Sequence, residues 1–298
     1  MSAPVTLGRM TTSTDTSSGS SEAGSGRADI GVIGGSGFYE FLTDSHRVRV
    51  TTPFGEPSDD VVVGDLEGRS VAFVARHGQG HRFPPHRVNY RANLWALRSV
   101  GVRQVLAPCA VGSLKPEHGP GTIVVPDQVV DRTWGRAHTI YDGVGPVVHV
   151  GFADPYCPRG REAVINTGGV DGKDLVDGGT LVVINGPRFS SRAESLWHQQ
   201  AGWTLVGMTG MPEAAIAREL AMCFTTVALV TDHDAGVDGG QGVTHEEVIK
   251  VFGRSLEGLK SVLKSTIGAM PLPEDDESAT CPCRRSLDGL KLPMALPT

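Results

Sequence analysis

Six short runs rich in valine, isoleucine and other apolar residues are spaced along the chain, and polar or turn-forming residues follow each run. Runs of this length, bounded by glycine, proline and aspartate, are typical of buried β-strands. They occupy residues 30–35, 71–78, 103–113, 121–131, 179–190 and 225–236. The pattern therefore predicts a sheet with largely parallel or mixed strand directions.

Helix-compatible segments lie between and after these runs. Residues 88–101 place apolar side chains on one helical face before Gly101, and residues 211–223 have Pro212 near a helix start. Residues 244–270 form the last such segment. Strands that alternate with helices predict a single-domain α/β fold, with a central mixed β-sheet flanked by helices.

The two ends of the chain differ from this body. Residues 1–28 are rich in serine, threonine and glycine, with few large apolar side chains, so burial cannot offset the entropy lost on ordering. We expect a disordered tail there and one domain over residues 29–270. Residues 271–298 are expected to form an extension that packs on the domain or on a neighbouring subunit.

Overall composition narrows the class of function. The chain has 298 residues, 39% of them hydrophobic, and a formal net charge of −6. A chain with a net negative charge lacks the basic surface that is typical of nucleic-acid-binding proteins. We find no apolar run of membrane-spanning length, no secretory signal and no disulfide framework among the five cysteines. We therefore expect a cytoplasmic protein that binds neither nucleic acid nor a membrane.

Polar residues gather directly after the predicted strands. Ligands of α/β sheets bind beyond the carboxyl ends of strands, so these positions are the candidate site. They supply hydroxyls, a guanidinium, an imidazole, backbone amides and two carboxylates, from Ser36, Arg76, His77, Cys109, Ala110, Phe189, Ser190, Asp232 and Asp234. Such a set can bind an anion at one end and a group that carboxylates recognise at the other, without a metal.

Single motifs within this set have plainer interpretations. Residues 34–37, Gly-Gly-Ser-Gly, form either an anion cradle or a simple turn after a strand. Arg76 could pair with a carboxylate, and Asp232 with Asp234 could solvate a loop. His77 and His81 are spaced like metal ligands, but the glycines between them disfavour a helix and no glutamate is adjacent.

The last two cysteines, Cys281 and Cys283, have the spacing of half a zinc site, but no second pair follows them. A local clip or two inert thiols is the favoured interpretation, and no metal is predicted.

Longer strings identify a family resemblance. They are "IGVIGGSGF", "TPFGEPSD", "ARHGQGH", "VNYRANLWAL", "DQVVDRTWGR", "GPRFSSRAES", "GMTGMPEAAIARE" and "TDHDAG", in this order. From about residue 30 to about residue 265 the chain resembles the methylthioadenosine phosphorylase branch of the trimeric purine nucleoside phosphorylases. The resemblance implies that the loop after the first strand grips a phosphate co-substrate.

The resemblance also implies a role for each site residue. The phosphate contacts are expected from Ser36, Arg76, His77, Cys109, Ala110 and Thr209. The nucleoside contacts are expected from Phe189, Ser190, Met208, Asp232, Asp234 and His245, of which Asp232 and Asp234 are the catalytic pair. The family commonly has threonine at the position of Cys109, so the backbone amides there are the expected donors.

Physical chemistry agrees with these roles. The forked donors of Arg76 suit a pair of phosphate oxygens. A protonated carboxyl at Asp232 can donate to purine N7 and neutralise the departing base, while its second oxygen accepts from a 6-amino group. Asp232 therefore favours adenine over a 6-oxopurine.

The sugar end is ambiguous. Methylthioadenosine-specific members place an apolar residue where this chain has His245, whereas phosphorylases of ordinary nucleosides tend to have histidine there. His245 could bond a 5′-hydroxyl or turn out to solvent.

We therefore predict a phosphorylase that releases adenine and a sugar 1-phosphate from methylthioadenosine or adenosine, with no cofactor beyond phosphate as co-substrate. The alternatives are a 6-oxopurine phosphorylase, acting on inosine, guanosine or methylthioinosine, and a non-catalytic purine-binding protein. A homotrimer that can pair into a hexamer is expected. Its candidate interface segments are residues 139–152 and 290–297.

Overall fold

The computed structural model describes residues 26–35, 41–169, 175–237, 244–271 and 281–297. Residues 1–25 of the predicted tail, and Ser36, lie outside the described residues. Ala28, near the end of that tail, is buried, and its N–H donates to the Val100 carbonyl. None of the described helices has the length and apolar content needed to cross a bilayer.

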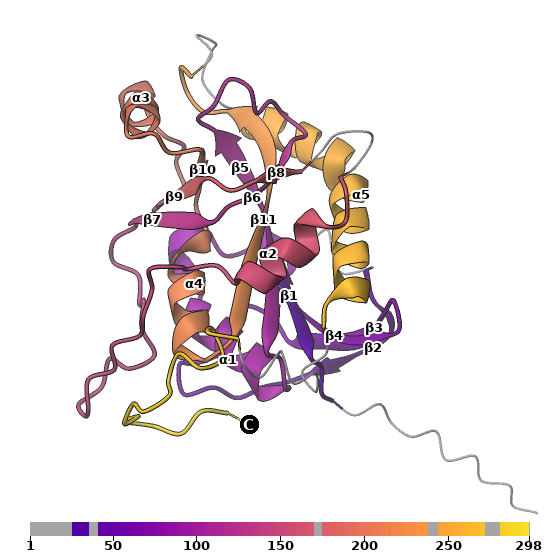
Figure 1. Cartoon of the computed structure of the whole chain (residues 1–298), viewed down its shortest axis with the longest axis vertical. Helices are drawn as coiled ribbons and strands as arrows, with labels where there is room; N and C mark the ends of the chain where they lie inside the picture. Colours follow the sequence, from indigo (N-terminus) through magenta and orange to yellow (C-terminus); the bar gives the residue numbers. More distant parts are fainter. Residues whose placement is uncertain (1–25, 36–40, 170–174, 238–243, 272–280, 298) are drawn as a thin grey trace, which may run out of the picture.

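One sheet of eleven strands forms the centre of the described molecule (Figure 1). Its strands are β1 (Ile30–Gly34), β2 (Thr43–Val48), β3 (Val61–Leu66), β4 (Arg69–Ala75), β5 (Gln104–Ser113), β6 (Ile123–Val125), β7 (Gln128–Arg132), β8 (Val176–Asp177), β9 (Thr180–Ile184), β10 (Leu205–Gly207) and β11 (Cys223–His233). The main path runs β2-β3-β4-β1-β5-β10-β9-β7, and β11 branches from β5 to pair with β6.

Strand directions confirm the mixed sheet. β1 is parallel to β4 and β5, and β5 is parallel to β11, while β10 and β6 run antiparallel to β5 and β11. The run 121–131, expected as one strand, is two. Pro126 has no N–H to donate to a neighbouring strand, so the run is interrupted at Pro126 and Asp127. Its two halves pair with different strands: β6 pairs with β11, and β7 pairs with β9.

Helices cover both faces of this sheet, as expected (Figure 1). They are α1 (Tyr90–Ser99), α2 (Pro158–Ile165), α3 (Arg192–Gln200), α4 (Gly210–Glu219) and α5 (His245–Ala269). One buried cluster joins α1 and α4 to residues such as Ile33 and Val105. A second joins α2 and α5 to Val32 and Leu106, which point to the opposite face. Two short 3-10 turns, Gln79–His81 and Pro85–Arg87, precede α1.

The long pair β5–β11 positions the candidate site. It runs in register from Cys223 opposite Gln104 to Val230 opposite Val111, and then a bulge at Thr231 shifts Asp232 opposite Gly112. A bulge adds one residue to one strand and re-aims the side chains that follow. Asp232 therefore lies beside Gly112 near the end of β5, and Asp234 follows the last residue of β11, where its N–H donates to the Ser113 carbonyl.

Candidate active site

The loop after β1 starts beside Arg76. Gly34 and Ala75 are paired at the ends of the parallel strands β1 and β4, and the Arg76 N–H donates to the Gly34 carbonyl at 2.9 Å. Gly35 and Arg76 therefore leave the sheet side by side. Ser36 follows immediately but lies outside the described residues, so its phosphate contact stays a prediction.

Arg76 forms a buried ion pair with Glu213 of α4. Its Nε lies 2.6 Å from Glu213 Oε1 and its Nη2 lies 3.0 Å from Oε2, while the Pro108 and Ile33 carbonyls accept from Nη1 and Nη2. Burial opposes the positive charge, but Glu213 outweighs it and the pKa of Arg76 is raised. The charge is therefore fixed at the ends of β1 and β4, beside the middle of β5.

This geometry changes the expected phosphate contact. A guanidinium has five N–H donors, and the four contacts above leave one Nη1 donor of Arg76 among the described groups. The two-pronged phosphate contact expected from the sequence does not match this arrangement, because Glu213 occupies the fork. A phosphate role for Arg76 stays a prediction, now resting on its buried charge and one donor.

His77 is held as a neutral imidazole. Its Nδ1 lies 2.8 Å from the Phe83 carbonyl, which can only accept, so Nδ1 carries the proton and Nε2 is an acceptor. Burial, and then the charge of Arg76, lower the pKa of His77 to about 4. The His81 ring stacks on His77 with centroids 4.1 Å apart and an interplanar angle of 14°.

Cys109 and Ala110 lie midway along β5, and Thr209 lies between β10 and α4. Cys109 is half-buried on β5, and desolvation raises the pKa of its thiol to about 12, so it is neutral beside Arg76. Ala110 follows it and is exposed. Thr209 is buried at the N-cap of α4, where its side chain makes no capping bond. Met211 has extended backbone angles (φ −122°, ψ 135°), so the regular part of α4 begins after it, at Pro212.

Asp232 lies directly over Gly112. A Cβ added to Gly112 would lie 3.0 Å from Asp232 Oδ1 and 3.3 Å from Asp234 Cβ. The Thr231 hydroxyl donates to Asp232 Oδ2 at 2.8 Å. Burial is the main cause that raises the pKa of Asp232 to about 6, and Asp234 adds to it against the opposing Thr231 bond. The carboxyl is therefore poised to hold a proton near neutral pH.

Asp234 is buried and accepts a hydrogen bond from the Ser195 hydroxyl of α3. That bond ties α3 to the end of β11. The half-buried residues Phe189 and Ser190 lie in the segment before α3, and the Ser191 capping box with Glu194 fixes the start of that helix. The segment with the predicted purine-binding residues thus leads into a helix that Ser195 ties to Asp234.

Met208 is fixed by Arg136 and Gly186. Arg136 Nη2 donates to the carbonyls of Met208 and Asn185, at 2.9 Å and 2.8 Å, and its Nη1 donates to the Met211 carbonyl. A Cβ on Gly186 would come within 2.6 Å of Met208 Sδ. The half-buried Met208 side chain is therefore confined next to Thr209.

His245 is the exposed first residue of α5, after the Thr244 N-cap. Its charge contributes to lowering the pKa of His81, after burial, and Glu247 contributes to raising that of Asp232. The start of α5 therefore lies within electrostatic range of both the histidine stack and the carboxylates.

Four residues that position this site were missing from the sequence-based set: Glu213, Arg136, Ser195 and Gly112. Their strings "MPEAA", "DRTWGR", "SRAES" and "AVGS" were noticed only as strings or strand ends. Nothing in the sequence shows that Glu213 pairs with Arg76, because the pairing joins elements far apart in the chain.

Gly112→Ala is expected to lower kcat/KM several-fold, because the new Cβ would lie 3.0 Å from Asp232 Oδ1 and 3.1 Å from Val206 Cγ1, so the carboxyl must move by a few tenths of an ångström. Gly207→Ala on β10 is the matched control, since its Cβ would contact only the Leu181 and Val111 side chains, both at 3.3 Å. Steady-state kinetics on both variants check this. Equal losses would assign the effect to general packing instead.

A model of a known protein family matches most of the chain. The family model described as "Phosphorylase superfamily" matches residues 29–268. The chain belongs to the phosphorylase superfamily. The resemblance seen in the sequence is thereby confirmed.

Individual relatives agree with this membership. A purine nucleoside phosphorylase of Streptomyces coelicolor is 57% identical over 278 residues, covering 91% of this chain and 98% of the relative. An S-methyl-5′-thioadenosine phosphorylase of Mycolicibacterium smegmatis is 53% identical over 269 residues, covering 90% and 99%. The two names differ in the substrate they specify.

Solved structures of the family have the same fold. A methylthioadenosine phosphorylase from an Antarctic soil metagenomic library superposes with a TM-score of 0.82 at 39% identity, covering 90% of this chain and 93% of that chain. A methylthioadenosine phosphorylase of Schistosoma mansoni in complex with adenine gives a TM-score of 0.76 at 36% identity, covering 81% and 91%.

Proposed function

We propose that this phosphorylase-superfamily member cleaves the N-glycosidic bond of a 6-aminopurine nucleoside, methylthioadenosine or adenosine, using phosphate. The products are adenine and the corresponding sugar 1-phosphate. The observation that carries the proposal is the Asp232 carboxyl, aimed by the β11 bulge over Gly112 with its pKa raised to about 6. The similarity to methylthioadenosine phosphorylases supports the same reaction.

At the base end, Asp232 acts as the acid. Its proton is donated to purine N7 as the glycosidic bond breaks, so the base departs as a neutral molecule. The other oxygen accepts from the 6-amino group, while Asp234, held by Ser195, keeps the loop in place. Phe189 and Ser190 contact the purine.

At the phosphate end, the buried charge of Arg76 holds the anion near the cationic sugar carbon. His77 Nε2 accepts a hydrogen bond from a protonated phosphate oxygen, because its own proton is on Nδ1. Thr209, Ser36 and the backbone at Cys109 and Ala110 supply further phosphate contacts. Met208 lies under the ribose.

A 6-oxopurine phosphorylase is the competing enzymatic function. Asp232 opposes it, because the carboxyl oxygen left over when Asp232 donates its proton to N7 can only accept, and the O6 of inosine is also an acceptor. A non-catalytic purine-binding protein is the competing function of another class, and the buried charge of Arg76 next to the β1 loop opposes it, since a base-binding protein has no use for a phosphate site.

The test is a parallel steady-state assay of methylthioadenosine, adenosine and inosine, each with and without phosphate. Phosphate-dependent release of adenine, with inosine the slowest substrate, is expected. Faster turnover of inosine would replace the proposal with the 6-oxopurine alternative, and tight adenine binding without turnover would replace it with the binding protein.

His245→Val is expected to shift the preference from adenosine toward methylthioadenosine by roughly 1–2 kcal/mol, because it removes a partner for the 5′-hydroxyl and adds apolar contact. His46→Val, at an exposed position of β2, is the control. The ratio of the two kcat/KM values measures the effect. An unchanged ratio would place His245 outside the sugar site.

We also propose a cytoplasmic homotrimer that can pair into a hexamer. Val144 and Val147, in the predicted interface segment 139–152, are 109% and 77% exposed, and Gly145 lies against Pro293 of the second segment, 290–297. Exposed apolar side chains gathered in this way are typical of subunit interfaces. Light scattering is expected to give a trimer or hexamer mass, and a stable active monomer would refute the assembly.

A further inference from the structure

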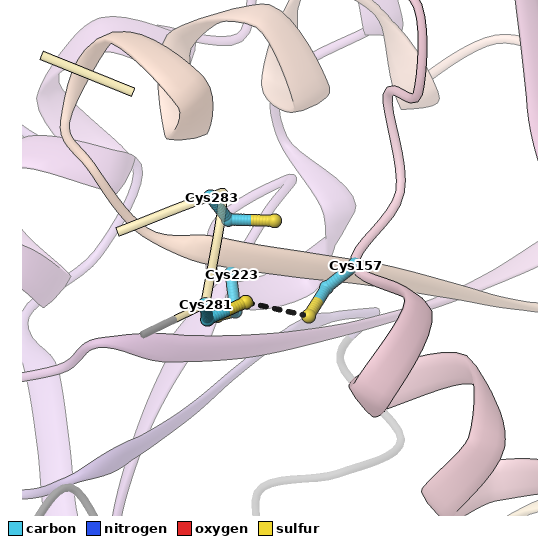
Figure 2. A group of neighbouring side chains, drawn as sticks. All are labelled: Cys157, Cys223, Cys281 and Cys283. Carbon is cyan, nitrogen blue, oxygen red and sulfur yellow. Dashed lines mark hydrogen bonds between the residues drawn. The ribbon is translucent and has the colours of Figure 1, made fainter. Parts of the chain in front are cut away.

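Four of the five cysteines meet at one buried point remote from the active site (Figure 2). Cys157 is the N-cap of α2, Cys223 is the first residue of β11, and Cys281 and Cys283 belong to the segment after α5. All four side chains are buried, at 1%, 5%, 1% and 2% exposure in that order. Two further sulfurs thus come from earlier in the chain, so Cys281 and Cys283 are not an isolated pair.

The sulfur positions surround a common centre. All four Sγ atoms lie within 4.8 Å of one another, and Cys281 Sγ lies 3.6 Å from both Cys157 Sγ and Cys223 Sγ. In a tetrahedral zinc tetrathiolate, Zn–S bonds of about 2.3 Å place the sulfurs about 3.8 Å apart. A disulfide would instead draw two sulfurs to about 2.05 Å. Two equal distances from one sulfur fit a shared ion better than a pair.

The surroundings are suited to thiolate charge. Zinc with four thiolates carries two negative charges, and Arg218 Nη2 lies 3.8 Å from Cys283 Sγ. The carbonyls of Gly151 and Asp154 accept from Arg218 and hold its guanidinium in place.

We propose that Cys157, Cys223, Cys281 and Cys283 bind one zinc ion as a tetrathiolate. Four protein ligands complete the tetrahedral coordination and leave no position for substrate, as in structural zinc sites. Along β11, Cys223 lies five residues from Ala228, which pairs with Cys109, and nine residues from Asp232, about 16 Å and about 30 Å at the rise of an extended strand. The ion is therefore structural, and it fastens the C-terminal segment to α2 and β11.

The first test is the metal content of the full-length wild-type chain, purified in reducing buffer without chelator. Elemental analysis is expected to give about one zinc per chain, and X-ray absorption four sulfurs at about 2.3 Å from the zinc. This measurement needs no variant, so it does not depend on how well a substituted chain folds.

Matched variants assign the ligands. Cys223→Ser and Cys281→Ser are each expected to lose the bound zinc and to melt at a lower temperature, whereas Cys109→Ser, which removes the cysteine outside the cluster, is expected to keep one zinc. Zinc removal from the wild type by a strong chelator should lower its melting temperature in the same way.

Three results would overturn the proposal. They are a metal-free wild-type chain with all thiols free after denaturation, a wild-type chain with disulfides among these four cysteines, and one that contains iron in place of zinc. Retention of zinc by Cys223→Ser and Cys281→Ser would also refute the ligand set. Activity enters none of these tests, so their failure is distinct from failure of the proposed function.

Discussion

Asp232→Asn is expected to lower kcat/KM for adenosine and methylthioadenosine about 10²–10⁴-fold, the usual contribution of a positioned acid. The amide cannot transfer a proton to N7. It can donate to O6, however, so the ratio of inosine to adenosine turnover should rise. Steady-state kinetics with both bases measure this, and Asp288→Asn, at an exposed position in the C-terminal segment, is the matched control. An unchanged ratio between the two bases would contradict the assignment.

The same carboxyl predicts a pH dependence. Because burial raises the pKa of Asp232 to about 6, its acid form is present below that pH and is lost as pH rises through it. The wild-type kcat/KM should therefore fall above about pH 6, beyond any fall caused by ionisation of phosphate. Asp232→Asn has the same phosphate and no titrating group at this position, so the difference between the two profiles isolates the carboxyl. Identical profiles would exclude Asp232 as the acid.

Breaking the Arg76–Glu213 pair is expected to lower the free energy of unfolding by about 3–5 kcal/mol, because either single change leaves a buried charge without its partner. Arg76→Met and Glu213→Leu are the single variants. The double variant, Arg76→Met with Glu213→Leu, should recover most of this stability, because it leaves neither charge behind. Denaturant unfolding of the three variants measures the recovery.

The double variant also separates folding from phosphate use. It should still show a loss of about 10²–10³-fold in kcat, with a raised phosphate KM, because the charge that holds the anion is gone. If the double variant kept the phosphate KM and the kcat of the wild type, Arg76 would contribute to folding but not to phosphate binding. The test matters because the Arg76 fork is directed at Glu213 rather than at open space.

The sequence predicted the elements that are long or strongly periodic. The strands that end at Gly34, Ala75, Ser113 and His233 were anticipated, because buried parallel strands read as continuous apolar runs. The long helix α5 was predicted as the last helical segment, residues 244–270. Short elements were missed, such as α2 with eight residues and β8 with two, because too few residues carry a period.

In the candidate site, too, some residues could be placed from the sequence and others could not. Arg76, His77 and Asp234 directly follow strands, or come one residue after them, and Asp232 is the next-to-last residue of β11, so their place could be inferred from the apolar runs. The bulge at Thr231 could not, because a bulge depends on how β11 pairs with β5. The cysteine cluster was missed because Cys157 and Cys223 reach Cys281 only through the packing of α2, β11 and the C-terminal segment.

Phosphorus NMR of the complete reaction tests the central claim most directly, because it follows the fate of phosphate itself. Methylthioadenosine or adenosine is incubated with the full-length chain and inorganic phosphate, and the adenine released is quantified in the same sample. The proposed function predicts one sugar 1-phosphate formed for each adenine released, and no adenine when phosphate is omitted. Adenine released at the same rate without phosphate, or no sugar 1-phosphate from either nucleoside, would contradict it.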